Sequence, residues 1–590
     1  MMDKEIEALG KLFELEKIKQ IICVDDQYRE FDEYTINDFI GYIASDEEIK
    51  TKIKNGVEEL GNLIWDDDAH WKNQLTGIWS DADNAKRKSL YEQLIQFIPG
   101  FPNHDNQKKD EDYLGALEEL LKQLRNIDLK KLSYSQWTKD YGRGGELLID
   151  DDLEKKGTLF LFDQDYSNES ECGGTNDGGI NIIKSLFEKH RNTPIMCGLL
   201  SHTFEPYEEY KRWDDFARDP GIDKDRLVLI AKRNLTEDKP GFVRGVRRTI
   251  LSKYCKTLKD QTSVILKESL DQSKKELDKL SIYDFEQIVF RSAYDEGIWE
   301  TDTLFRLYNI YQKNFIRQEI MKSKELLNST ARIREISKIS KESTLWNQSE
   351  LKKIHQLEYY EEGKQINGLH MPIGLGDIFI KTASTSQRKF ILIAQPCNLM
   401  VRTSKNLEGK RAYNFHEAVL AEIFNGTCPQ NEFCIEILYF DANSGTPQYI
   451  DLQKTYSVLL CIIDLCVFNK EGLARMSSDY ICPSEIIPAW KYRFKKLKDR
   501  FDEIIEECIE LKSKGFDEAF LKKHLLPKSS HEDNGLFKPK IDLTKNGKES
   551  ITYDCRRIRR LCRPQAEAIL LKYSHYISRS AFDHDFGKKR

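Results

Sequence analysis

Four apolar runs of this 590-residue chain each lead into a polar residue of the kind that phosphoryl chemistry uses. The acidic pair Asp25 and Asp26 follows the first run, and the later runs lead to Asp163, Ser201 and Lys232. Paired carboxylates hold a hard cation such as Mg²⁺, and a single carboxylate can act as a nucleophile. A lysine and a hydroxyl can hold a phosphoryl oxygen. If these side chains meet, the sequence predicts a phosphoryl site with Mg²⁺ on Asp25, Asp26 and Asp163.

The runs that carry these residues span 21–24, 159–163, 194–201 and 227–231. Four to eight apolar residues in succession are typical of strands buried on both faces of a parallel sheet. Ligands of such sheets bind at the carboxyl ends of the strands, where the five polar residues fall. We therefore expect a doubly wound parallel-sheet α/β domain that gathers them at one edge.

This α/β domain is expected to cover residues 1–250. The long interval between the first two runs has apolar residues at helical spacing, which predicts a large helical insertion at about 35–150. The whole chain is thus expected to be multidomain, α/β plus α and β. The other expected parts are a helical connector or bundle at 255–365, a mostly β domain at 366–480, and a helical C-terminal region at 485–590 with a polar loop at about 527–549.

Composition excludes several classes of protein. The formal net charge of −7 argues against a surface that binds nucleic acid throughout, so any basic site has to be local. The 13 cysteines form no CxxC pair, and many lie in apolar runs, which predicts reduced, buried thiols. The amino terminus is acidic rather than signal-like, and the apolar stretch 458–468 is too short to cross a bilayer. We expect a cytoplasmic protein with no membrane partner.

In order and context, the five residues resemble the receiver domain of bacterial two-component response regulators. Asp25 and Asp26 match that family's acidic pair, and Asp163 matches its phospho-accepting aspartate. Ser201 matches the switch hydroxyl after the fourth strand, and Lys232 matches the lysine after the fifth. The resemblance implies a phosphoprotein that uses Mg²⁺, and it covers about 40% of the chain.

Two features depart from the receiver pattern. Receivers place a proline after the lysine, whereas Arg233 stands here, so the cis-proline turn of the family is not expected. The stretch 167–179 is long and glycine-rich, where the family has a short turn. Thr203 is a less suitable match for the hydroxyl than Ser201. The narrower resemblance is to divergent receivers of bacterial conflict systems, including the Detocs type of phage (antiviral) defence.

The resemblance implies that Asp163 accepts a phosphoryl group from a partner histidine kinase or another phosphodonor protein. The chain has no glycine pattern for binding ATP, so the donor has to be a separate molecule. A phosphate sink or relay that acts through protein contacts is the specific expectation, with a downstream effector response regulator as a further partner. The protein is then not an enzyme, apart from slow autodephosphorylation.

Two other readings stay open for the same residues. Asp163 and Asp165 resemble the Asp-x-Asp motif of haloacid-dehalogenase-type phosphatases. Those enzymes need a further acidic pair downstream of the lysine, and no strand after Lys232 ends in one. A degenerate receiver scaffold that is not phosphorylated is the second reading.

Two further features favour structural roles. Cys397 has no histidine near it in any local pattern, which favours a buried cysteine at a strand end over a nucleophile. The arginine cluster 555–563 is expected to lead into a packed helix, with its arginines facing solvent or carboxylates. Nucleic acid is therefore not the partner that this cluster predicts.

Overall fold

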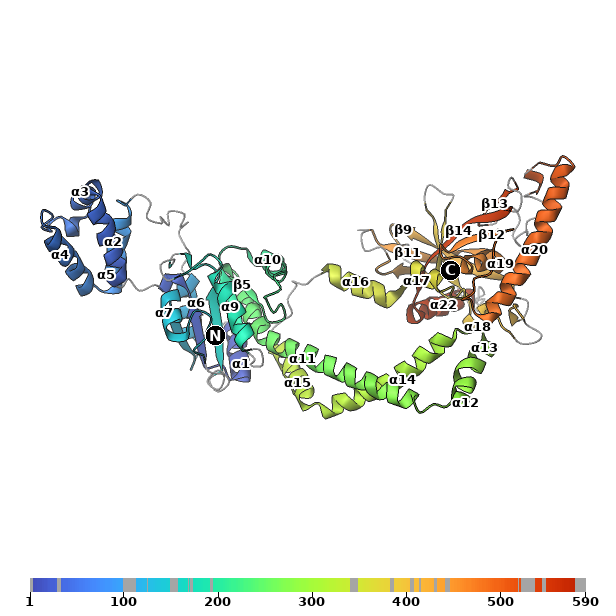
Figure 1. Cartoon of the computed structure of the whole chain (residues 1–590), viewed down its shortest axis with the longest axis horizontal. Helices are drawn as coiled ribbons and strands as arrows, with labels where there is room; N and C mark the ends of the chain where they lie inside the picture. The colour runs from blue at the N-terminus through green and yellow to red at the C-terminus, as the bar shows by residue number, and fades with distance from the viewer. Residues whose placement is uncertain are drawn as a thin grey trace, which may run out of the picture. The chain divides into compact units, whose positions relative to one another are not determined.

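The chain is described by a computed structural model. It covers residues 4–28, 33–98, 113–124, 126–148, 157–167, 169, 173–190, 195–339, 348–382, 387–403, 408–412, 415–428, 432–440, 446–517, 519–521, 536–543 and 548–578. The chain consists of two compact units (Figure 1). The N-terminal unit comprises Met1–Glu268 and Ile316–Trp346, and the C-terminal unit comprises Ser269–Phe315 and Asn347–Arg590.

The N-terminal unit is built on a five-stranded, all-parallel sheet in the order β2-β1-β3-β4-β5. Its strands are β1 (Gln20–Val24), β2 (Asp128–Leu132), β3 (Thr158–Asp163), β4 (Met196–Ser201) and β5 (Leu229–Ala231). The expected α/β architecture is confirmed at this level. Because the strand order reverses between β1 and β3, the crevice for a ligand in a sheet of this type lies at their carboxyl ends.

Alternate side chains of the strands enter two separate cores, which explains the unbroken apolar runs. One core joins the sheet to α1 (Lys4–Glu16), α6 (Tyr113–Lys122), the first part of α11 (Lys239–Leu277) and α15 (Lys324–Ile339). The other joins it to α7 (Tyr134–Tyr141), α9 (Gly178–Lys189) and α10 (Glu209–Phe216). The unit is therefore a three-layer α/β sandwich.

The helical insertion is shorter than expected. Helices α2 (Glu33–Ser45), α3 (Glu47–Gly56), α4 (Asp68–Asp81) and α5 (Asn84–Ile95) form a bundle in Figure 1. Their core consists of residues from 36 to 98 alone. The insertion was expected to extend to about residue 150, and this was wrong, because β2 and α7 of the α/β sandwich lie between residues 35 and 150. β2 has the charged sequence DLKKL and is a half-exposed edge strand, so it gave no apolar run to detect.

The C-terminal unit contains a separate antiparallel sheet whose main order is β10-β11-β9-β8-β7-β14-β12. Strands β13 and β6 pair with β14 outside that order. The strands are β6 (Tyr360–Glu362), β7 (Asp377–Lys381), β8 (Lys389–Ile393), β9 (Glu417–Asn425), β10 (Cys434–Ile437), β11 (Gln448–Leu459), β12 (Leu473–Ser477), β13 (Pro539–Asp542) and β14 (Ser550–Leu561).

Helices cover both faces of this sheet. One core includes residues of α19 and α20, and the other includes residues of α22. The unit's helices are α12 (Ile282–Phe285), α13 (Ser292–Glu296), the first part of α14 (Glu300–Lys322), α16 (Gln348–Tyr359), α17 (Gly363–Gly368), α18 (Pro396–Leu399), α19 (Leu460–Asp464), α20 (Pro488–Ser513) and α22 (Arg563–Ile577). A π-helical segment covers Glu286–Arg291.

The β sheet does not end near residue 480, as the sequence led us to expect. The region 485–590 contains the helices α20 and α22, in line with the expected helical region, but it also supplies β14, which pairs with β7 and β12 and was not expected. Arginines interrupt the apolar pattern of β14. For this reason its sequence was interpreted as a charged segment that precedes a helix. Most of the expected polar loop at 527–549 lies outside the described residues, and β13 begins within it.

Candidate functional site

The strand ends of the N-terminal unit place the five predicted residues at one edge of the sheet. Asp25 and Asp26 follow β1, while Asp163 and Ser201 are the last residues of β3 and β4. Lys232 directly follows β5 and begins a 3₁₀ turn, η5 (Lys232–Leu235). The parallel register aligns these positions, because each strand ends beside the end of its neighbour.

The four charged residues form one buried cluster. Lys232 Nζ lies 2.8 Å from Asp25 Oδ2 and 3.1 Å from Asp163 Oδ2. Carboxylate oxygens of Asp25, Asp26 and Asp163 all lie within 4.8 Å of one another. Asp25, Asp163 and Lys232 are at most 2% exposed, and Asp26 is half-buried. The juxtaposition that the sequence predicted is therefore present.

Burial and mutual repulsion dominate the electrostatics of the cluster. Burial raises the pKa of Asp26 to about 8, and the charges of Asp25 and Asp163 add to the rise. Burial also raises the pKa of Asp163 to about 7, although the ammonium of Lys232 opposes this. Burial alone would lower the pKa of Lys232, but attraction to Asp163 and Asp25 outweighs it and raises that pKa. Three carboxylates thus face one ammonium, an excess of two negative charges if all are ionised.

The hydroxyl groups belong to a small network beside Asp163. Ser201 Oγ donates to Gln164 Oε1 at 3.0 Å, and Thr203 Oγ1 donates to the same oxygen at 2.9 Å. The two hydroxyl oxygens are 2.8 Å apart. Ser201 is fully buried, whereas Thr203 is exposed. The network links the end of β4 to the residue that follows Asp163.

Asp165, the second aspartate of the alternative phosphatase motif, has a different position. Its Oδ1 accepts a hydrogen bond from the backbone N–H of Ser167 at 2.8 Å, as in a side-chain-capped turn. The group of carboxylates able to share a cation, within the part of the chain that the structure describes, contains Asp25, Asp26 and Asp163 but not Asp165.

Glu209 at the start of α10 holds the strand end that carries Lys232, a role that the sequence did not reveal. Its buried carboxylate accepts hydrogen bonds from the backbone N–H of Ala231 at 3.1 Å and from Asn234 Nδ2 at 2.7 Å. Arg233 forms an ion pair with Glu205 in the loop after β4. Across the described residues no peptide bond is cis, in agreement with Arg233 in place of the family's proline.

The loop after Asp163 is anchored at several described points. Tyr166 Oη donates to the carbonyl of Val24 at 3.0 Å. The buried carboxylate of Glu169 accepts hydrogen bonds from the N–H groups of Tyr134 and Ser135 in the first turn of α7. These contacts tie the loop to the ends of β1 and β2. No apolar pattern signalled them, because each depends on a single polar side chain.

Gly179 in the first turn of α9 allows that helix to approach the end of β3. A Cβ atom at this position would lie 1.8 Å from the backbone oxygen of Asp163. The glycine pair 178–179 therefore serves close packing beside Asp163. The remainder of the glycine-rich stretch is only partly within the described residues.

The arginine cluster 555–563 lies on β14 and the start of α22, so the expectation that it precedes a helix was right only for its end. Arg557 is buried and lies 3.4 Å from Asp377, while Arg560 Nε lies 2.6 Å from the same carboxylate. Arg559 pairs with Glu362 at 2.8 Å. These arginines neutralise carboxylates of β6 and β7, as expected from the sequence for arginines that face neighbouring carboxylates.

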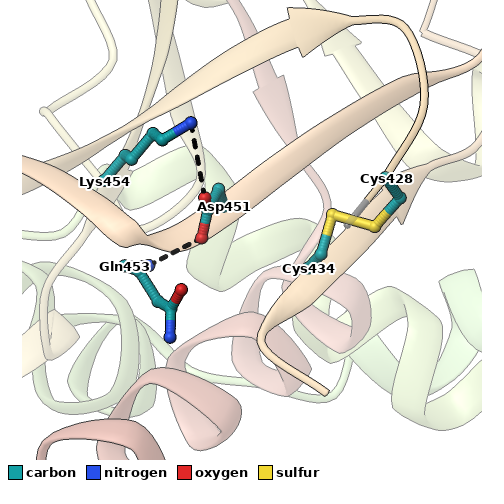
Figure 2. The surroundings of a disulfide bond; sticks show 5 residues. All are labelled: Cys428, Cys434, Asp451, Gln453 and Lys454. Carbon is teal, nitrogen blue, oxygen red and sulfur yellow. Dashed lines mark hydrogen bonds and ion pairs between the residues drawn. A yellow bond between two sulfur atoms is a disulfide. The ribbon is translucent and has the colours of Figure 1, made fainter. Parts of the chain in front are cut away.

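The expectation of reduced, buried thiols holds for Cys23, Cys197 and Cys466, but two other cysteine expectations were wrong. Cys397 is exposed in α18 rather than buried, and its sulfur lies near side-chain oxygens of Gln395 and Asn398. Cys428 and Cys434 form a disulfide between the end of β9 and the start of β10 (Figure 2). No CxxC motif marks this pair, because five residues separate the two cysteines.

Among the described helices, none combines the length and the apolar character needed to cross a bilayer. No protein-family model, no curated protein and no solved structure matches this chain. The buried cluster at the sheet edge is therefore the observation on which a functional conclusion has to depend.

Proposed function

We propose that the N-terminal unit is a receiver-type phosphoacceptor, in which Asp163 takes a phosphoryl group from a phosphodonor. The observation that carries this proposal is the buried cluster of Asp25, Asp26, Asp163 and Lys232. It lies at the carboxyl ends of β1 and β3, where the strand order reverses. Burial of several carboxylates together is energetically costly, which supports a cation or a phosphoryl ligand at this place.

The charge of the cluster fits a divalent cation. Three carboxylates and one ammonium meet in this cluster, and hard carboxylate oxygens are the ligands that Mg²⁺ takes. Asp25, Asp26 and Asp163 would hold the ion. When bound, Mg²⁺ would neutralise charge on the incoming phosphoryl oxygens.

The transfer itself needs little covalent help from the protein. An oxygen of Asp163 forms the new bond to phosphorus, and the bond to the donor's leaving group breaks, leaving an aspartyl phosphate. Lys232, already placed 3.1 Å from Asp163, neutralises the charge that develops on the phosphoryl group. Ser201 is the hydroxyl that senses the product, because its partner Gln164 follows Asp163 directly.

A histidine kinase or another phosphodonor protein supplies the phosphoryl group under this proposal, and a downstream effector response regulator is a second partner. The setting is a bacterial signalling or anti-phage defence pathway, with the protein as a phosphate sink or relay. Resemblance in the order of five residues supports this setting.

The proposal is tested by phosphate-affinity electrophoresis with acetyl phosphate and Mg²⁺. The wild-type protein should give a retarded band, and Asp163→Ala should give none. Asp165→Asn is the matched control, because Asp165 lies outside the carboxylate group and should leave the retarded band intact.

Three results would contradict this function. Failure of the wild-type protein to take the label would indicate a degenerate scaffold. Labelling of Asp163→Ala would place the acceptor elsewhere. Turnover of a phosphomonoester such as p-nitrophenyl phosphate that is lost in Asp165→Asn would indicate the phosphatase.

A further inference from the structure

Helix α20 in the C-terminal unit has an unusual distribution of charge. Its first half contains six basic residues and one acidic residue, whereas the second half contains five acidic residues and one basic residue. The basic residues of the first half are Lys491, Arg493, Lys495, Lys496, Lys498 and Arg500. This order opposes the helix dipole, which favours acidic residues in the first turn. Helix stability therefore does not explain it.

The loop at 408–412 adds more positive charge to the same place. Gly409 has a φ of +61°, and a Cβ atom there would lie 2.6 Å from the backbone carbon of Tyr492, so the loop lies directly against α20. Lys496 Nζ donates a hydrogen bond to the carbonyl of Glu408. A β-bridge pairs Arg402 with Lys410. The segments that carry Arg402 and Lys410 are thereby paired with each other and held against the part of α20 that carries Arg493 and Lys496.

The positive charge of this group is only partly compensated among the described residues. Asp464 is fully buried and already accepts hydrogen bonds from both Arg411 and Arg493. Five cations (Arg402, Lys410, Arg411, Arg493 and Lys496) and three carboxylates (Asp464, Glu408 and Asp295) belong to this region, a net charge of +2. The pKa of Lys496 is lowered by burial and by the charges of Lys410 and Arg493, as expected for crowded cations. Arg411 and Arg493 share Asp464, so among the described residues the excess positive charge belongs to Arg402, Lys410 and Lys496.

Two tyrosines lie beside these cations. Tyr294 of α13 is 43% exposed, and its hydroxyl is hydrogen-bonded to that of Tyr492 on α20. The neighbouring Thr403 donates a hydrogen bond to the backbone carbonyl of Tyr294, which fixes α13 against the loop that carries Arg402. The charged groups that act on Tyr294 are Glu408 and Asp295. Its exposed ring offers a stacking surface for a base next to the loop that carries Lys410.

We propose that this basic surface, made of Arg402, Lys410, Lys496 and Tyr294, binds the phosphodiester backbone of a nucleic-acid strand. Several cations at separate positions can contact successive phosphates of a nucleic-acid backbone, whereas a single small anion would occupy only one of them. The tyrosine ring can stack on an unpaired base, which favours a single strand. The overall charge of −7 makes the patch local, so binding is confined to this face of the C-terminal unit. The proposal is independent of the phosphoacceptor.

The test uses the full-length protein and a labelled single-stranded oligonucleotide of roughly 20 nucleotides, followed by fluorescence anisotropy between about 50 and 200 mM salt. Affinity should fall as salt rises. The double variant Lys410→Glu with Lys496→Glu should weaken binding at least about tenfold. It should also reduce the slope of log K against log salt by about 1.4, because two phosphate contacts on a single strand are lost.

The matched control is Lys454→Glu with Lys538→Glu, which changes the net charge equally on exposed lysines outside this surface. Lys454 is 68% exposed in its side chain and lies beside Asp451 (Figure 2). The control should bind as the wild-type protein does. The double variant Lys410→Gln with Lys496→Gln keeps a hydrogen-bond donor for the Glu408 carbonyl. It should lose less affinity than the glutamate variant, and this graded loss would distinguish a loss of charge from misfolding.

Three outcomes would overturn this inference. One is the absence of salt-dependent binding by the wild-type protein. Another is an equal loss in the control variant, which would indicate diffuse charge attraction. The third is competition by polyglutamate as effective as that by unlabelled oligonucleotide, which would assign the surface to an acidic protein.

Discussion

Lys232 Nζ lies 3.1 Å from Oδ2 of Asp163, and both side chains are almost completely buried. Residues from two strand ends that are distant in the sequence are thus joined by an ion pair without solvent screening. The same ammonium also lies 2.8 Å from Asp25. Because three carboxylates depend on this one cation, it controls both the stability of the site and its charge.

Replacement of this cation should destabilise the N-terminal unit. Lys232→Met removes the cation that pairs with the buried carboxylates of Asp25 and Asp163, a change that typically costs about 3–5 kcal/mol. The raised pKa of Asp163 would rise further, so the variant's folded state would hold its protons more tightly than the unfolded state. Stability should therefore decrease as pH rises, and the loss should be larger near pH 8 than near pH 5.5. Hydrogen exchange of peptides covering β1 and β3 measures this locally.

The control for Lys232→Met is Lys184→Met, which removes a surface ion pair with Asp219. Exposed pairs contribute about 0–1 kcal/mol, so exchange should change little. Equal protection of β1 and β3 in wild type and Lys232→Met would contradict the role assigned to Lys232.

Binding of Mg²⁺ should depend on pH in a defined direction. The pKa values of Asp26 and Asp163 are about 8 and about 7, so a cation has to displace protons below that range. Affinity measured by calorimetry should therefore be higher near pH 8.5 than near pH 6, by up to tenfold for each pH unit and each proton displaced. Asp26→Asn should weaken binding and reduce the pH dependence. Equal affinity at both pH values would contradict this prediction.

Gly179 should tolerate no side chain. Gly179→Ala places a Cβ 1.8 Å from the backbone oxygen of Asp163, so α9 or the end of β3 has to move. We expect a loss of about 1–3 kcal/mol, as for other overpacked sites, together with reduced labelling by acetyl phosphate. Gly77→Ala in α4 is the matched control, since no atom lies within 4 Å of the added Cβ. The control should be neutral or slightly stabilising. Normal labelling of Gly179→Ala would contradict the close approach.

Ser201 and Thr203 should differ in function even though both donate to Gln164. Ser201 is buried at the end of β4, so Ser201→Ala should still take the phosphoryl label but lose the change in hydrogen exchange of α10 that the label produces. Thr203→Val should keep that change, because Thr203 faces solvent. The reverse result would assign the sensing role to Thr203.

The sequence by itself determined that a parallel sheet exists and that Asp25, Asp163, Ser201 and Lys232 stand at its carboxyl edge. Strands buried on both faces need unbroken apolar runs, and the edge follows from strand direction alone. No such signal marked β2 or β14, because an edge strand stays half-exposed and β14 carries arginines that pair with carboxylates of distant strands.

Only the tertiary structure decided which groups meet across long sequence intervals. Glu209 reaches the end of β5, Glu169 caps α7, and the loop that carries Lys410 lies against α20. Each of these contacts depends on one polar side chain or one glycine, and a local pattern contains no information about its partner. Apolar burial follows from the periodicity of a sequence, whereas the pairing of single polar groups follows from how the chain is folded in three dimensions.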